Sequence, residues 1–172
     1  MEISATFNDH GALKHFQATP QMIDRAVKDA ISAVANEMLR EVRGKDGLSM
    51  FGRHKAGTPT PSAPGQPPAQ ISGDLRKSVK KFPVHRHGHG DYSVSVMPTA
   101  PYAKIQEKGG TITPKTKPYL AFQINGQWVF ARSVTIPARP FIEPARKRLR
   151  KNDRIQRMFR HKMYESLKRH HA

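Results

Sequence analysis

Cysteine is absent from this chain of 172 residues, and acidic residues are scarce: 13 Asp and Glu stand against 30 Lys and Arg. Without thiols the chain has no disulfides, no thiolate metal site and no cysteine nucleophile. The formal net charge of +17 means that copies repel one another unless something acidic neutralises them. Nucleic acid, an acidic protein surface or an anionic membrane would each do so.

Long apolar runs are also missing. No stretch approaches the 18 or so apolar residues of a membrane-spanning helix. Residues 1–9 are polar and acidic, unlike the basic and then apolar start of a secretion signal. The sequence therefore predicts a soluble protein of the cytoplasm, and its 37% of hydrophobic residues are enough for one modest core.

Catalytic patterns are lacking as well. The sequence has no phosphate-binding Gly-rich loop, no zinc-ligand spacing and no nucleophile elbow. Glu37 and Glu41 are one helical turn apart, but Arg40 and Arg43 lie beside them, so ordinary surface ion pairing explains these carboxylates. We therefore predict that the chain is not an enzyme and has no cofactor.

One group of histidines requires a separate interpretation. His85, His87 and His89 alternate, so a strand would place them on one side, where a transition metal can bind imidazoles. Only Asp91 lies nearby to complete a ligand set, and the surrounding glycines are typical of a hairpin tip. We interpret the group as a solvated turn and predict no metal site.

The first half of the chain indicates a strand, a long helix and a loop. Residues 2–8 alternate apolar and polar as in a strand. A broad apolar stripe of helical period predicts a helix over 20–43, capped by Thr19 and ended at Gly44. Residues 44–70 follow, with five prolines between 59 and 68 that exclude a helix or a central strand. We expect an extended loop that is either a flexible insert or an arm ordered on a neighbouring subunit.

Short elements are expected after the loop. A helical turn over 72–78 leads into a hairpin of residues 79–87 and 92–97, with its turn at 88–91. A helix over 101–108 ends at Gly109-Gly110. The Asn125-Gly126 pair predicts a second hairpin, formed by residues 118–124 and 127–136.

A basic helical segment follows Phe141. Residues 146–169 contain eleven Lys and Arg but only two acidic residues, a net charge of +9. Apolar residues at 149, 155, 159, 163 and 167 form a narrow seam, and Asn152-Asp153 indicates a break. The cations are interpreted as contacts for DNA phosphates, for an acidic protein ring or, least favoured, for a membrane. The candidate contact residues are Arg146, Lys147, Arg148, Arg150, Lys151, Arg154, Arg157 and Arg160.

Three segments form a pattern when they are taken in order. The first joins Ser62-Ala63-Pro64-Gly65-Gln66-Pro67-Pro68 to Ser72-Gly73-Asp74-Leu75-Arg76. The second is Tyr102-Ala103-Lys104-Ile105-Gln106-Glu107-Lys108-Gly109-Gly110-Thr111-Ile112. The third is Val134-Thr135-Ile136-Pro137-Ala138-Arg139-Pro140-Phe141-Ile142. Together they resemble the phage tail-completion or neck proteins of the virion-morphogenesis family. The basic extension after residue 145 is longer than the family pattern, so its role is not carried over.

The resemblance implies an α+β fold in which a long N-terminal helix packs on a small antiparallel sheet. It fits a domain over 1–145 that includes the Pro-rich loop or arm of 44–70. The basic helical extension over 146–172 is predicted from its own residues and not from the resemblance. The resemblance also implies a ring at the head–tail junction and assigns no catalytic residues. The interface residues that it suggests are Pro64, Gly65, Leu75, Arg76, Tyr102, Gly109, Gly110, Arg139 and Phe141. Arg139 would hold a carboxylate or backbone carbonyls, with an intrachain clamp favoured slightly.

Two functions from different classes follow. The first is a structural virion protein that completes the tail or neck and joins tail to head, in a cyclic ring for which sixfold symmetry is favoured. Its partners would be itself, neighbouring neck, connector or tail-tube proteins and, without sequence specificity, packaged DNA. The second is a basic nucleic-acid-binding module similar to a ribosome-associated protein, although the sequence lacks an RNP-like aromatic strand or a helix-turn-helix.

Overall fold

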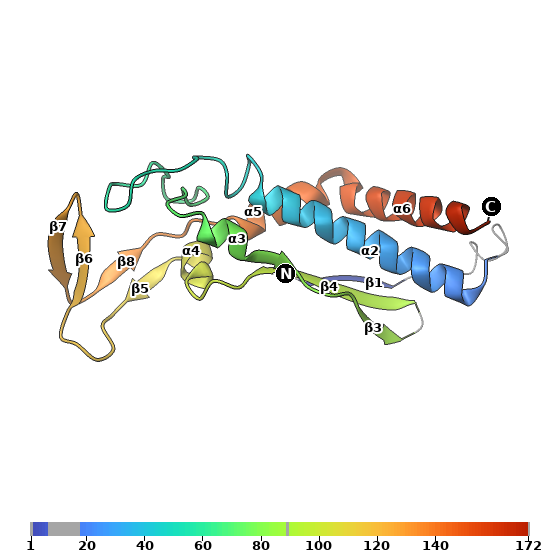
Figure 1. The fold of residues 1–172 in the computed structure, drawn as a ribbon, viewed down its shortest axis with the longest axis horizontal. Helices are drawn as coiled ribbons and strands as arrows, with labels where there is room; N and C mark the ends of the chain where they lie inside the picture. The colour runs from blue at the N-terminus through green and yellow to red at the C-terminus, as the bar shows by residue number, and fades with distance from the viewer. Residues whose placement is uncertain (1, 7–17, 89, 172) are drawn as a thin grey trace. The chain divides into compact units, whose positions relative to one another are not determined.

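The computed structural model describes residues 2–6, 18–88 and 90–171. The predicted α+β class is confirmed: long helices stand near both ends of the described chain, and the strands between them pair antiparallel (Figure 1). The chain divides into two compact units. Unit 1 is Met1–Arg40, Lys80–Met97 and Arg146–Ala172, and unit 2 is Glu41–Val79 and Pro98–Ala145. The predicted boundary at residue 145 stays a prediction, because compactness does not show which part folds alone.

Helix α2 (Pro20–Arg43) has the predicted bounds. The hydroxyl of Thr19 accepts a hydrogen bond from the backbone N–H of Met22 at 3.3 Å, as an N-cap residue does. The apolar stripe of the helix is the main part of the unit 1 core. Its fully buried members in that unit are Ala26, Val27, Ala30, Ile31, Val34, Ala35 and Met38.

The sheet is centred on strand β4 (Asp91–Pro98). Strands β1 (Glu2–Thr6) and β3 (His85–Gly88) pair antiparallel with it, and β2 (Val79–Lys81) is its other neighbour. The prediction of one strand over 79–87 is wrong, because the chain leaves the strand conformation at 82–84, where Pro83 has no N–H to donate. Residues 7 and 8 of the first predicted strand and His89 of the predicted turn lie outside the described residues.

The basic segment forms α5 (Ile142–Arg150), a single 3₁₀ turn (Lys151–Asp153) and α6 (Arg154–His171). The predicted break is confirmed: Asn152 and Asp153 have left-handed φ angles of 55° and 52°. Within the predicted seam Leu149, Met163 and Leu167 are buried, while residues 155 and 159 are half-buried. The buried seam residues belong to the core of unit 1, and the hydroxyl of Ser166 donates to Asp29 of α2 at 2.8 Å. Ile155 and Phe159 instead line a cavity of about 660 Å³ beside Ile31 of α2.

Unit 2 contains short elements joined by long loops. They are α3 (Asp74–Ser78), α4 (Ala103–Lys108), the antiparallel pair β5 (Gly110–Ile112) with β8 (Val134–Ile136), and the hairpin of β6 (Leu120–Ile124) with β7 (Gln127–Ala131). The predicted Asn125-Gly126 turn is confirmed. The prediction of one strand over 127–136 is wrong, because β8 pairs with β5. In the hairpin register Ser133 would face Pro118, which has no N–H to donate.

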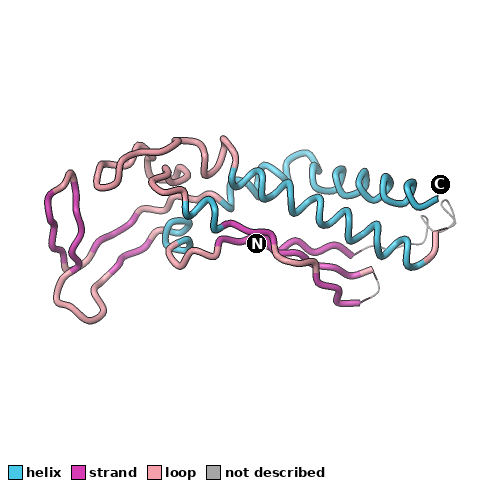
Figure 2. Tube along the Cα trace, viewed as in Figure 1, coloured by secondary structure: helices cyan, strands magenta, loops and turns pink. Residues whose placement is uncertain are grey.

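The loop over 44–70 contains no helix and no strand of a sheet, as predicted (Figure 2). It is not extended throughout, however. The backbone N–H of Gln70 donates to Gly52 O at 3.0 Å and the N–H of His54 donates to Gln70 O at 2.8 Å, so the end of the loop is joined back to residues 52–54. Ser62 near its middle is only 3% exposed. Whether the loop changes on assembly stays a prediction.

Candidate assembly surfaces

Two of the three motif segments meet at Arg139. Its guanidinium donates to the backbone oxygens of Ser62 and Ala63 and, at 2.7 Å, to the hydroxyl of Ser62. Ala138 O also accepts the N–H of Gly65 at 2.8 Å. Arg139 is therefore the intrachain clamp that the sequence favoured, and it holds carbonyls of the Pro-rich loop rather than a carboxylate.

The remaining motif segment joins the same cluster through Glu107. Its carboxylate accepts hydrogen bonds from the backbone N–H groups of Phe141, Ile142 and Glu143 at 2.8, 3.0 and 3.0 Å. These N–H groups begin α5, where no intrahelical acceptor exists and the helix dipole favours a negative charge. Gln106 O accepts the N–H of Arg139 at 2.7 Å as well. Glu107 thus caps a helix that follows it by more than thirty residues in the chain.

Sequence reasoning missed this role of Glu107. The residues before α5 are Arg139-Pro140-Phe141, none of which has the side-chain oxygen of a usual N-cap. That local absence was the available signal that a distant acceptor is needed. It did not identify Glu107, because sequence spacing carries no information about which distant carboxylate approaches.

The paired glycines are required by the same cluster. Gly109 has a φ of 70°, and a Cβ there would lie 2.7 Å from Ala138 N and 2.9 Å from Ile136 O. Gly110 has a φ of 150° and begins β5. Phe141, at the start of α5, is fully buried. Three residues suggested as interface, Gly109, Arg139 and Phe141, therefore have roles within the chain.

The other suggested interface residues are more accessible. Gly65 and Pro64 are exposed in the loop, and Leu75 is half-buried in α3. Arg76 is exposed, and its Nε donates to Arg43 O and to the hydroxyl of Ser49, both at 3.0 Å. The ring of Tyr102 is 44% exposed at the start of α4. The structure thus brings the motif segments together but leaves part of each at the surface.

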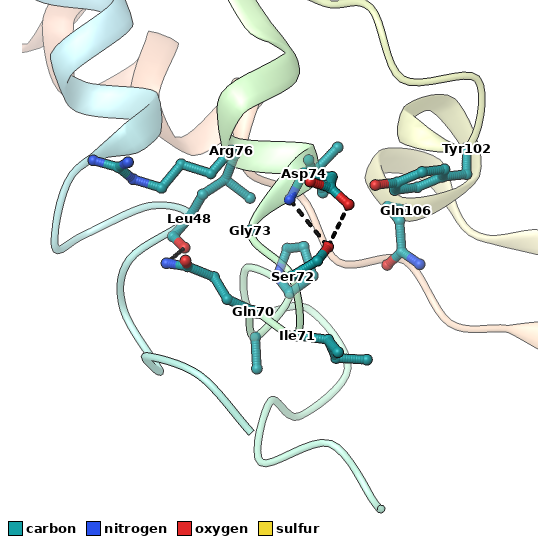
Figure 3. A pocket seen from close by; sticks show the side chains of 12 residues that line it. Leu48, Gln70, Ile71, Ser72, Gly73, Asp74, Arg76, Tyr102 and Gln106 are labelled. Carbon is teal, nitrogen blue, oxygen red and sulfur yellow. Dashed lines mark hydrogen bonds between the residues drawn. The ribbon is translucent and has the colours of Figure 1, made fainter. Parts of the chain in front are cut away.

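A cavity of about 240 Å³ lies where the loop end, α3 and α4 approach (Figure 3). Tyr102 and Gln106 line its α4 side, opposite the segment of Ser72 and Asp74. The hydroxyl of Ser72 donates to Asp74 Oδ2 at 2.5 Å and accepts the Asp74 N–H at 3.3 Å. The cavity walls combine this polar turn with the apolar side chains of Leu48 and Ile71.

The basic segment presents its cations opposite its seam. Of the eight candidate contact residues, five are exposed: Lys147, Arg150, Lys151, Arg157 and Arg160. Arg154 instead forms an ion pair with Glu37, which also pairs with Arg40. Arg146 and Arg148 are half-buried and have partners within the chain.

Helical spacing on α6 places residues 157, 160, 161, 164 and 168 on the face turned away from the core.

The ion pair of Glu37 with Arg40 was predicted as an ordinary surface pair. Glu37 is only 9% exposed, so the prediction that the pair lies at the surface is wrong.

The β6–β7 hairpin exposes large apolar side chains. Phe130 is 66% exposed, Trp128 63%, Ile124 46% and Tyr119 45%. The sequence predicted the hairpin but not that these side chains are exposed. Arg132 lies over the ring of Tyr119, 6.0 Å from its centre.

The described part of the chain has neither a group of side chains arranged to bind a metal ion nor a membrane-spanning helix. Residues 2–6, 18–88 and 90–171 contain no cluster of three His, Asp or Glu arranged to bind a metal ion. His85 is exposed, and a ring nitrogen of His87 is 2.8 Å from the hydroxyl of Ser93. None of the helices described is both long and apolar enough to span a bilayer.

One buried polar group stabilises unit 1. Burial raises the pKa of Tyr92, and its hydrogen bond to the carboxylate of Asp24 raises the pKa further. Asp24 also forms an ion pair with Arg86 at 2.7 Å. This trio joins α2 to β3 and β4, which is a structural role.

Comparison of the chain with protein-family models, curated proteins and solved structures found no match.

Proposed function

We propose that this chain is a structural subunit of a tailed-phage virion, which forms a ring that completes the tail or neck and joins the tail to the head. The observation that supports the proposal is the meeting of the three motif segments in one cluster of unit 2. Arg139, Glu107 and Gly109 each have their geometry set by a second motif segment, so the three segments form one structural cluster.

In this function the protein acts by assembly rather than by catalysis. The exposed parts of the motif segments, Pro64, Arg76 and Tyr102 among them, would contact neighbouring subunits or the adjoining neck, connector or tail-tube proteins. Sixfold symmetry would match a tail, and the protein would lie at the head–tail junction of the virion after assembly in the host cytoplasm.

The test is electron microscopy of particles that form without this protein. Unjoined heads and tails are expected. Complete, infectious virions would exclude the proposed function.

An alternative function is a basic nucleic-acid-binding module. The exposed cations of α5 and α6 favour it, because Lys and Arg on an outward helix face neutralise phosphates without reading sequence. Measurement of DNA binding by the isolated protein over a range of salt concentrations separates the two functions. Tight binding that weakens steeply with salt favours the alternative, whereas weak binding with ring formation favours the virion subunit.

A further inference from the structure

The β6–β7 hairpin is both uncharged and rich in exposed aromatic side chains. Residues 118–131 contain no Asp, Glu, Lys or Arg, although the chain as a whole has a net charge of +17. Two copies of such a chain repel each other wherever their basic surfaces approach. Contact between copies is therefore favoured at a surface that is both neutral and apolar, and the hairpin has both properties.

The hairpin register divides its side chains between two faces. Ala121 lies opposite Phe130 and Gln123 lies opposite Trp128, so the two large aromatic residues share one face. Residues 120, 122 and 129 point to the other face and are half-buried. Because Trp128 and Phe130 are each more than 60% exposed, the first face, which we name the aromatic face, is uncovered in the single chain.

A two-stranded hairpin alone in water is marginally stable at best, and it gains stability when another surface covers it. Exposed aromatic side chains in a neutral patch are also typical of the buried centre of protein interfaces, where charged residues are depleted. We propose that a second copy of this chain covers the aromatic face of Trp128 and Phe130 in the assembled protein. The inference rests on the proposed ring-forming function and identifies the surface that makes the contact.

Nucleic acid is the competing occupant, because bases also stack on exposed aromatic rings. Such platforms combine the rings with a positively charged groove that follows the phosphates. The run of 118–131 contributes no cation, and Lys55 is the one cation that lines the hollow beside Trp128. Arg132, which follows the run, lies over Tyr119. Charge therefore favours another copy of the chain over nucleic acid.

Trp128 is the only tryptophan of the chain, so its fluorescence reports directly on the aromatic face. The experiment compares the full-length wild type, Phe130→Ser and Tyr164→Ser across a dilution series, with native mass spectrometry for the mass and tryptophan emission for burial. Tyr164 is a matched control, since its ring is 52% exposed but lies on α6. Circular dichroism establishes that each variant is folded.

The wild type and Tyr164→Ser are expected to form oligomers and to shift their emission to shorter wavelength as concentration rises. Phe130→Ser should need at least a tenfold higher concentration for both changes. Added salt should promote association, because it screens the repulsion between basic chains. Oligomers of Phe130→Ser that form at the wild-type concentration, or a wild type that stays monomeric throughout, would overturn the inference.

Two further outcomes are informative. An emission shift on adding a single-stranded oligonucleotide to monomeric protein, reversed by salt, would also overturn the inference and assign the face to nucleic acid. Failure of the proposed function is distinguishable, because it appears as complete virions made without the protein. Self-association through Trp128 would persist in that case.

Discussion

The two units of this chain are stabilised in different ways. Of the apolar side chains that are buried among the described residues, sixteen belong to unit 1 and six to unit 2. The large apolar side chains that are exposed show the reverse distribution, with seven in unit 2 and two in unit 1. Unit 1 therefore rests on a hydrophobic core, whereas unit 2 rests on hydrogen bonds between distant backbone segments and keeps apolar surface available for contacts. The predictions below test this difference.

The largest effect is expected from a cavity in the core of unit 1. Ile31 is fully buried, so Ile31→Ala should lower the free energy of unfolding by about 2–5 kcal/mol in urea denaturation. Ile71→Ala is the control, because this residue of unit 2 is 51% exposed and its truncation should change stability by no more than about 0.5 kcal/mol. Equal effects of the two substitutions would contradict a core confined mainly to unit 1.

Loss of the Arg139 clamp is expected to loosen unit 2 selectively. Arg139→Ala removes a charged donor from three acceptors on Ser62 and Ala63, at a cost of about 1.5–3 kcal/mol. Limited digestion with trypsin should then cleave faster after Arg53 and Lys55, while hydrogen exchange of the α2 amides in unit 1 stays near wild type. Arg157→Ala, which removes an exposed arginine of α6, is the matched control. Faster exchange throughout α2 would show that the clamp stabilises both units.

The distant cap on α5 should have a smaller and more local effect. Glu107→Ala removes the acceptor of three N–H groups, and we expect the amides of residues 141–143 to exchange roughly tenfold faster, which corresponds to about 1.4 kcal/mol. Glu107→Gln keeps one acceptor oxygen but no charge and should fall between Glu107→Ala and wild type. A glutamine variant as fast as the alanine variant would mean that the charge, and not the acceptor, stabilises the helix end.

The smallest effect is expected at Tyr92, where a hydrogen bond supplements the core of unit 1. Tyr92→Phe removes the hydroxyl that donates to Asp24 and should cost about 1 kcal/mol at neutral pH. Because the folded-state pKa of Tyr92 is raised above its ordinary value of 10.0, this contribution is fully present below pH 10 and is lost as pH rises through the raised pKa. Urea denaturation of both proteins at neutral and alkaline pH measures it. A difference that grows above pH 10 would contradict the assignment.

The sequence predicted best what is decided locally. The bounds of α2, the Asn125-Gly126 turn and the break at Asn152-Asp153 depend on periodicity, on turn chemistry and on residues that tolerate positive φ, all of which can be read within a few positions. The pairing of β8 with β5 was missed because it joins segments more than twenty residues apart that compete with a strong hairpin signal.

The candidate assembly surfaces were also predicted only in part. The order of the motifs identified the segments that meet around Arg139, but it could not distinguish buried residues from exposed ones. Gly109 and Phe141 were therefore predicted at an interface, although both have structural roles within the chain. The exposure of Trp128 and Phe130 was not predictable either. An apolar residue in a strand pattern looks the same whether its own chain or another chain covers it.

The discontinuity of unit 1 has a consequence for synthesis. Its core combines residues of α2 with Leu149, Met163 and Leu167, more than a hundred positions later in the chain. A ribosome adds roughly 5–20 residues per second, so the apolar stripe of α2 waits several seconds for the helix that covers it. During that interval the nascent chain is exposed to aggregation and to chaperones. Residues 146–169 therefore complete the core of unit 1 and also contain most of the chain's excess positive charge. A chain released before their synthesis would lack both the covering helix and that charge.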